Sequence, residues 1–325
     1  MMKTFSQIVA DFLEERSALG FKDTGLKCRM NRIIRLQVKV DFGRPVLSQE
    51  LLEEWAQMLP LESVGTRSNR VSDLRALSLY MQRMGHDAVT VPKRYVPYKD
   101  SSYQPYIFSE GELASILSCV DERCMGGVSL TADFVYPIVF RLLIGSGLRV
   151  SEALAIRKAD YDPDAGVIRL VETKNHRERF IPIAESTNER LKHCTRQLAT
   201  RFEGYSFTEY LLPNAYGKPY SKITLYAFFR EMLWQAGISH GGRGRGPRLH
   251  DLRHTYAVMV LNRGFCEGKE MGALLQGLSI YMGHTGLKSS ERYLRMTKEM
   301  HSKVTDRYTE TFGWVLEGGR CHEGE

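Results

Sequence analysis

Only one stretch of this chain has the pattern of β-strands, and it lies between residues 167 and 183. Residues 167–171 and 179–183 are two runs rich in β-branched side chains, and they flank a polar tip at residues 173–177. This arrangement predicts a hairpin. Elsewhere the apolar residues recur at helical spacing. We therefore expect a mainly α fold with a small β-sheet.

A stretch rich in proline and tyrosine divides the helical pattern into two parts. Pro92, Pro97 and Pro105 interrupt any long helix, which predicts an extended linker over residues 86–105. Before the linker we expect a helical domain at residues 1–85, with Ser48 capping its third helix and Thr66 its fourth. After it we expect a mixed α/β domain at residues 106–325. Its helices are predicted at 109–117, 132–145, 186–203, 221–236, 250–263, 268–281, 287–296 and, in a tail, 297–316.

The charge balance favours a polyanionic partner. The 325 residues include 45 Lys and Arg against 38 Asp and Glu, a net charge of +7. The six cysteines form no framework, which is typical of reduced thiols. No signal peptide is recognisable, and no uncharged run approaches the ~20 residues that a membrane span requires. We expect a cytoplasmic protein that does not associate with membranes.

Basic residues gather at three places in the sequence. Spacing on a helix puts the first set on one face, and the third set belongs to a glycine-rich loop and the residues after it. The sets are Arg29, Arg32, Arg35 and Lys39; Arg67 and Arg70; and Arg243, Arg245 and Arg248. A solvated surface would look the same, so these residues are candidates for nucleic-acid contact only in combination with other evidence.

The last quarter of the chain holds side chains suited to attack on a phosphate. His250 and Arg253 lie three residues apart, and Tyr293 follows His284 by nine residues. A phenol titrates near 10 and needs help to lose its proton before it can attack. Arginines relieve the repulsion from the phosphate oxygens because they donate bidentately. A tyrosine-based site therefore requires arginines, histidines and a proton donor.

Other interpretations of these residues are open. His250 and His254 could form a zinc pair, although residue 251 is Asp where a metalloprotease helix has Glu, and no third ligand is obvious. We therefore expect no metal and no cofactor. Tyr281 and Tyr308 compete with Tyr293, but their spacing is typical of core or interface positions.

The order of the motifs resembles that of the tyrosine recombinases, the phage integrase family. Gly-Leu-Arg-Val-Ser-Glu-Ala-Leu at 147–154 comes first, followed by Lys174 in the hairpin. His-Asp-Leu-Arg-His-Thr-Tyr-Ala at 250–257, Met-Gly-His at 282–284 and Tyr293 complete the series. The resemblance extends over essentially the whole chain, although residues 1–100 match the family's helical core-binding domain only loosely. It implies a core-binding domain followed by a mixed α/β catalytic domain.

The resemblance implies a role for each of six residues. Arg149 and Arg253 would clamp the scissile phosphate, and Lys174 would protonate the leaving 5′-oxygen. His250 would assist proton transfer at the tyrosine, and His284 would hydrogen-bond a non-bridging oxygen. Tyr293 would form a 3′-phosphotyrosyl bond, so that DNA is rejoined without ATP or metal.

The implied function is site-specific recombination of double-stranded DNA, by an integrase or transposase of a mobile element. The basic residues would then face the duplex from two domains, and the protein would assemble on DNA as a dimer at each site and a tetramer in the synapse. A type IB topoisomerase, a telomere resolvase and a catalytically silent DNA-binding protein of recombinase descent are the alternatives.

Overall fold

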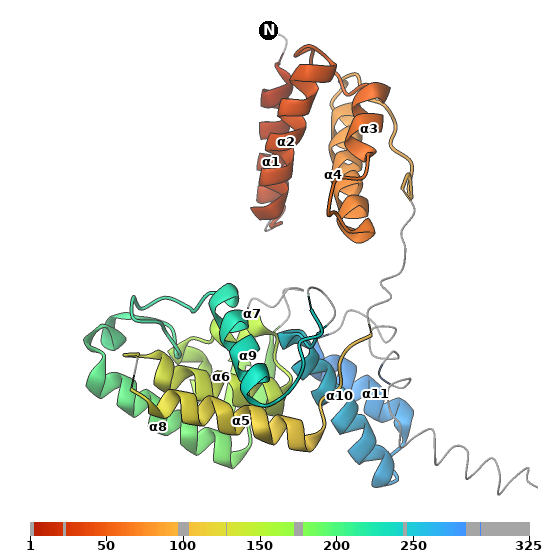
Figure 1. The fold of residues 1–325 in the computed structure, drawn as a ribbon. Coiled ribbons are helices and arrows are strands. Elements are labelled where there is room, and N and C mark those ends of the chain that lie inside the picture. The colour runs from red at the N-terminus through yellow and green to blue at the C-terminus, as the bar shows by residue number, and fades with distance from the viewer. Residues whose placement is uncertain are drawn as a thin grey trace, which may run out of the picture. The chain divides into compact units, whose positions relative to one another are not determined.

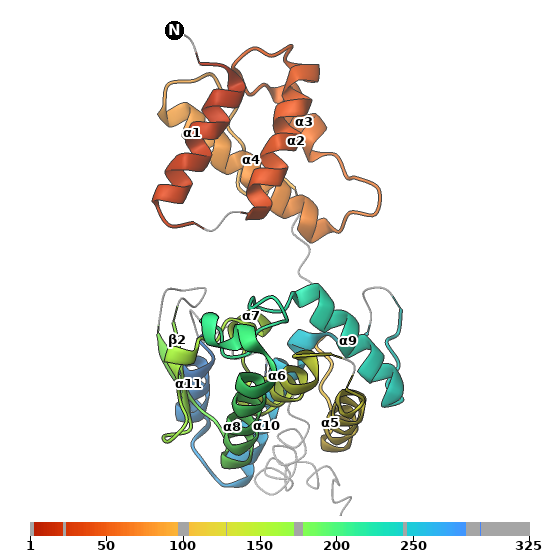
Figure 2. The same ribbon diagram turned by 90° about the vertical axis from the view of Figure 1, so that its left-hand side faces the viewer.

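The computed structural model describes residues 3–21, 24–96, 104–127, 129–171, 178–242, 246–283 and 293. The chain forms two compact units, Met1–Gln104 and Pro105–Glu325. Figures 1 and 2 show a helical first unit and a second unit in which helices accompany a small sheet. The prediction of a mainly α fold with a small β-sheet is confirmed. No helix in these ranges is long and apolar enough to cross a membrane.

The first unit is built from helices with local capping signals. Its helices are α1 (Phe5–Ala18), α2 (Thr24–Val40), α3 (Gln49–Ala56) and α4 (Val64–Arg83). Ser48 caps α3, as predicted, by accepting the Leu51 N–H at 3.0 Å. The cap predicted for α4 was wrong: Ser63, not Thr66, accepts the first-turn N–H, and the helix begins three residues earlier. Ser63 and Thr66 share a side-chain hydrogen bond of 2.8 Å, so both belong to this cap.

The start of the stretch between the units packs on the first unit. The backbone N–H of Leu47 donates to the backbone carbonyl of Asp87, and the backbone N–H of Val89 donates to the backbone carbonyl of Leu47. Val91 and Val96 are buried in the apolar core of the four helices. Residues 86–96 are therefore part of the first unit's packing, although Pro92 interrupts any helix there.

The second unit surrounds an apolar central helix. Its helices are α5 (Glu110–Met125), α6 (Ala132–Ser146), α7 (Val150–Leu154), α8 (Glu185–Arg201), α9 (Lys222–Gln235), α10 (Leu249–Cys266) and α11 (Met271–Met282), with short 3-10 turns at Lys158–Asp160 and Glu203–Phe207. Helix α6 contacts α5, α8 and α10, and α10 packs on α11 (Figure 1). Ser109 caps α5 through a capping box with Glu112. The helix expected at 287–296 and the tail helix at 297–316 lie outside the described residues, apart from Tyr293.

The predicted hairpin is present and has a third strand. Strands β1 (Tyr161–Asp162), β2 (Val167–Leu170) and β3 (Arg179–Pro182) form an antiparallel sheet in that order. Ile168 pairs with Ile181, and both are buried, so one face of the sheet covers the core. Leu170 pairs with Arg179. This register fixes the position of Arg179 at the start of β3.

Candidate active site

Two helices of the second unit end at glycines in the left-handed conformation. Gly147 ends α6 at φ 57°, and Gly283 ends α11 at φ 64°. Glycine adopts this conformation without the strain that a Cβ causes. The last carbonyls of a helix lack partners within it and carry a partial negative charge. The two helix ends therefore present acceptors to any nearby cation.

Arg253 connects these two helix ends. It lies on α10, is only 3% exposed and donates from Nη1 to the Gly147 carbonyl at 2.7 Å and from Nη2 to the Met282 carbonyl. Burial, followed by the positive charge of Arg149, lowers the pKa of Arg253 to about 10. A pKa of that size still leaves the guanidinium charged at neutral pH. Arg253 is therefore a buried cation held in place by backbone acceptors.

Arg149 joins the same site from the turn that follows α6. Its Nη2 donates to the Gly283 carbonyl at 3.1 Å, and its Nη1 donates to Glu152 at 2.6 Å. Glu152 also accepts the Arg149 backbone N–H at 2.9 Å, which fixes the first turn of α7. The structure thus brings the predicted pair Arg149 and Arg253 together at the end of α11.

Glu152 and Arg179 complete the charged cluster, and neither was among the predicted site residues. Arg179 donates from Nη2 to Glu152 at 2.7 Å, and the two side chains are 11% and 9% exposed. Burial alone would raise the pKa of the Glu152 carboxyl, but the Arg149 N–H and the Arg179 guanidinium together lower it. The signal for Glu152 was its place three residues after Arg149. Nothing local to residues 178–180 indicates which acidic partner Arg179 would find.

Gly283 also lies against the arginines. A Cβ on this residue would be 2.9 Å from Nη1 of Arg179 and 3.8 Å from Nη1 of Arg149. The glycine therefore serves both the helix cap and the close approach of the two guanidinium groups. Its predicted neighbour in the motif, His284, lies outside the described residues, as does Lys174 at the hairpin tip.

Tyr293 is buried next to a histidine of α10. Its ring is 2% exposed, and its hydroxyl lies 3.1 Å from Nδ1 of His254. The phenolate form of Tyr293 interacts favourably with the Arg253 charge. The exposed His250 contacts His254 edge to face, with ring centroids 4.8 Å apart. The structure therefore joins Tyr293 to the predicted histidines, but the contact that it describes is through His254.

The two competing tyrosines have different positions. Tyr281 stacks on Tyr256 at 5.7 Å and donates to the Ser146 carbonyl at 3.2 Å. Burial raises the pKa of the Tyr281 phenol. These contacts fit the packing role expected for it. Tyr308 lies outside the described residues.

The two histidines of the zinc interpretation, His250 and His254, both lie on α10. Within the described ranges, no group of three or more His, Cys, Asp or Glu side chains could hold a metal ion. His254 instead directs Nδ1 to Tyr293.

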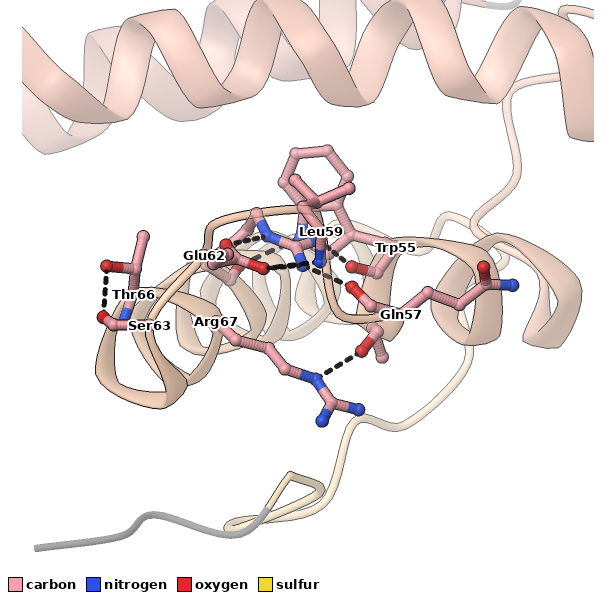
Figure 3. A network of polar contacts seen from close by, with 9 residues as sticks. Trp55, Gln57, Leu59, Glu62, Ser63, Thr66 and Arg67 are labelled. Carbon is pink, nitrogen blue, oxygen red and sulfur yellow. Dashed lines mark hydrogen bonds and ion pairs between the residues drawn. The ribbon is translucent and has the colours of Figure 1, made fainter.

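Arg70 corrects one of the expectations about DNA contact. It is 2% exposed, pairs with Glu62 at 2.8 Å and donates to the carbonyls of Trp55 and Gln57. Figure 3 shows Trp55, Gln57 and Glu62 gathered in this network. Glu62 neutralises this guanidinium, and the two carbonyls accept further N–H groups from it, so Arg70 holds α3 and α4 together and its charge is already paired.

The other predicted DNA-contacting residues differ in accessibility. Arg67 is half-buried and donates to the Ala56 carbonyl at 2.6 Å (Figure 3). Arg29 is partly exposed and pairs with Asp73. The remaining predicted residues within the described ranges are exposed: Arg32, Arg35, Lys39 and Arg248. Arg243 and Arg245 lie outside the described residues.

Comparison with known proteins identifies the family. The model of the phage integrase family matches residues 109–300, which is more than half of the chain. The chain belongs to the phage integrase family. It is therefore a tyrosine recombinase, an enzyme that cleaves and rejoins DNA.

Relatives of this recombinase span nearly all of its length. It is 27% identical to y4rB of Sinorhizobium fredii, which is named as an integrase or recombinase, over 94% of this chain and 97% of y4rB. Its fold is similar to that of lambda integrase, which was solved as a dimer on a COC′ core site. The TM-score is 0.62 and the identity 15%, over 90% of this chain and 95% of the lambda integrase chain. The Tn1549 transposon integrase, solved with a circular intermediate DNA, gives a TM-score of 0.60 and 17% identity over the same shares of the two chains.

Proposed function

We propose that this recombinase cleaves double-stranded DNA by attack of Tyr293 on a phosphodiester held by Arg149 and Arg253. The observation that carries the proposal is the burial of Tyr293 beside α10, within the electrostatic reach of Arg253. Arg149 lies on the same cluster, bonded to Gly283 at the end of α11. One nucleophile and two arginines that can donate hydrogen bonds to a phosphate thus come from three distant parts of the chain.

The reaction needs only charge and proton transfer from the protein. The arginines stabilise the charge that develops on the non-bridging oxygens. The Tyr293 oxygen bonds to phosphorus, and the bond from phosphorus to the 5′-oxygen breaks. Lys174 protonates that oxygen, and His284 hydrogen-bonds a non-bridging oxygen; both roles come from the family's motif pattern. The 3′-phosphotyrosyl link keeps the energy of the phosphodiester, so a 5′-hydroxyl reverses the attack without ATP or metal.

We also propose that the first unit is a DNA core-binding domain. Arg32, Arg35 and Lys39 are exposed on α2, where they can contact phosphates without reading bases. The lambda integrase structure is a dimer on its core site, which supports a dimer at each site here. We propose that two such dimers then form a tetrameric synapse. The Tn1549 relative supports a mobile element as the biological context.

A nicked DNA substrate tests the catalytic proposal. When the nick lies in the cleaved strand just downstream of the scissile phosphate, cleavage releases a short fragment with the 5′-hydroxyl, which prevents religation and traps the covalent complex. We expect an adduct at the 3′-phosphate that maps to Tyr293 and is absent from the Tyr293→Phe variant, whereas Tyr281→Phe keeps it. An adduct in Tyr293→Phe would contradict the assignment of the nucleophile. Relaxation of plasmid lacking a recombination site, or hairpin products, would indicate topoisomerase or resolvase activity instead.

A further inference from the structure

The hydroxyl of Tyr293 has a nitrogen partner inside the protein. It lies 3.1 Å from Nδ1 of His254, and the ring centroids are 5.5 Å apart at an angle of 54°. His254 is 7% exposed and Tyr293 is 2% exposed, so the contact is shielded from bulk water. A hydrogen bond between two buried side chains keeps their relative positions well defined.

Two adjacent residues of α10 contact different parts of the site. Arg253 points to the ends of α6 and α11, while His254 contacts Tyr293. His250 lies one turn earlier on α10 and is exposed, with its ring against that of His254 at 85°. The rings of Tyr293, His254 and His250 therefore follow one another from the protein interior to its surface.

We propose that His254 is the catalytic base for Tyr293. This inference rests on the proposed function, because it names the group that receives the nucleophile's proton. A neutral imidazole can accept a proton at Nδ1 while Nε2 keeps its own. As the Tyr293 oxygen bonds to phosphorus, its proton passes to Nδ1 and His254 becomes an imidazolium. In the reverse reaction His254 returns that proton to the departing phenolate.

The surroundings of Tyr293 favour this proton transfer. The Arg253 charge stabilises the phenolate that forms. His250, in contact with the His254 ring and open to solvent, lies where a proton can be passed on to water or DNA. The motif-based role of His250 in proton transfer is thereby moved one step away from the reacting oxygen.

The His254→Asn variant tests the proposal because asparagine keeps a hydrogen-bonding group near the Nδ1 position and removes the basicity. The measurement is the single-turnover rate of covalent complex formation on nicked DNA. General base catalysis contributes typically 10² to 10⁴ in rate, so a loss of about that size is expected. Replacing Tyr293 by 3,5-difluorotyrosine, whose phenol loses its proton more readily, should restore at least about tenfold in the variant, the size of effect expected from Brønsted behaviour.

Two comparisons distinguish a base at Tyr293 from a residue that stabilises the phosphate charge or protonates the leaving oxygen. Fluorotyrosine should not rescue Arg149→Lys, whose defect lies in phosphate charge. A 5′-bridging sulfur, which leaves without protonation, should rescue Lys174→Ala but not His254→Asn. Thermal melting identifies a variant that fails to fold, and the His254→Gln variant then takes its place.

Three results would overturn the role of His254. The first is cleavage by His254→Asn at the rate of the unmodified protein or faster. The second is a slow rate of His254→Asn that fluorotyrosine leaves unchanged, and the third is rescue by fluorotyrosine of His250→Asn but not of His254→Asn. The Tyr293→Phe variant is measured in the same assay. If it forms no adduct, Tyr293 is still the nucleophile, and only the role of His254 is refuted in each of these cases. An adduct that persists in Tyr293→Phe would overturn the proposed function itself.

Discussion

Glu152 carries the only carboxylate that the structure places between Arg149 and Arg179, among the described residues. Together with Arg253 the cluster holds three guanidinium groups and one carboxylate, a formal charge of +2. The Glu152→Gln substitution preserves the shape and raises this charge to +3 in a site where Glu152 is 9% exposed. Removing one partner of a buried ion pair costs about 3–5 kcal/mol. We expect about 3 kcal/mol, the lower end of that range, because glutamine keeps a hydrogen-bond acceptor and Arg149 is partly exposed.

Calorimetry or urea unfolding measures this loss. For a unit of this size, about 3 kcal/mol corresponds to a fall in Tm of roughly 6–12 °C. The matched control is Glu231→Gln, which makes the same change in an exposed pair with Arg123 at 3.1 Å. That variant should lose at most about 1 kcal/mol. Inorganic phosphate should raise the Tm of Glu152→Gln more than that of the unmodified protein, since it binds a more positive folded site.

The pH dependence provides a second test of the same reasoning. Because the folded pKa of Glu152 is lowered, its contribution to stability is present above the unfolded value and is lost as the pH falls through the folded value. The difference in stability between the unmodified protein and Glu152→Gln should therefore shrink below about pH 4. A variant within about 0.5 kcal/mol of the unmodified protein at pH 7, the usual range for a surface change, would refute the argument.

Three other substitutions follow from the same contacts. Arg70→Met leaves Glu62 buried without its partner and should cost the first unit about 3–5 kcal/mol in urea unfolding, while the exposed Arg35→Met stays within about 0.5 kcal/mol. Gly147→Ala puts a Cβ 2.4 Å from Cδ1 of Tyr256 at φ 57°, so it should lower the Tm and slow covalent complex formation; an unchanged rate would count against the position of the Gly147 carbonyl. Arg253→Lys loses a donor and should slow cleavage by about 10² to 10³, with DNA affinity measured by gel shift nearly retained.

Local features of the fold could be predicted from the sequence, because short-range chemistry decides them. Ser48 and Ser109 cap helices through bonds to residues three positions away, and the hairpin follows from its β-branched runs. Ser63 was missed because Ser63 and Thr66 are both good caps one turn apart. Strand β1 has two residues, too few for a periodic signal.

The candidate site was only partly predictable, because several of its contacts join distant residues. Motif order identified Arg149, Arg253 and Tyr293 as candidates. The bond between Arg179 and Glu152 spans 27 positions, and the contact between His254 and Tyr293 spans 39. Arg70 was misassigned because the sequence does not reveal that Glu62 and the carbonyl of Trp55 bind this arginine in the folded unit. Burial of a charge depends on tertiary packing, which a sequence pattern does not contain.

The ends of α6 and α11 orient the arginines without cancelling their charge. Gly147, Met282 and Gly283 supply carbonyls to Arg253 and Arg149, and each helix end carries roughly half a negative charge. The three arginines and Glu152 have a formal charge of +2, so these helix ends and Glu152 together leave the described cluster positive. A positive cluster of guanidinium groups suits an anionic phosphodiester. The left-handed glycines that end both helices bring the carbonyls to the arginines and so fix where this charge lies.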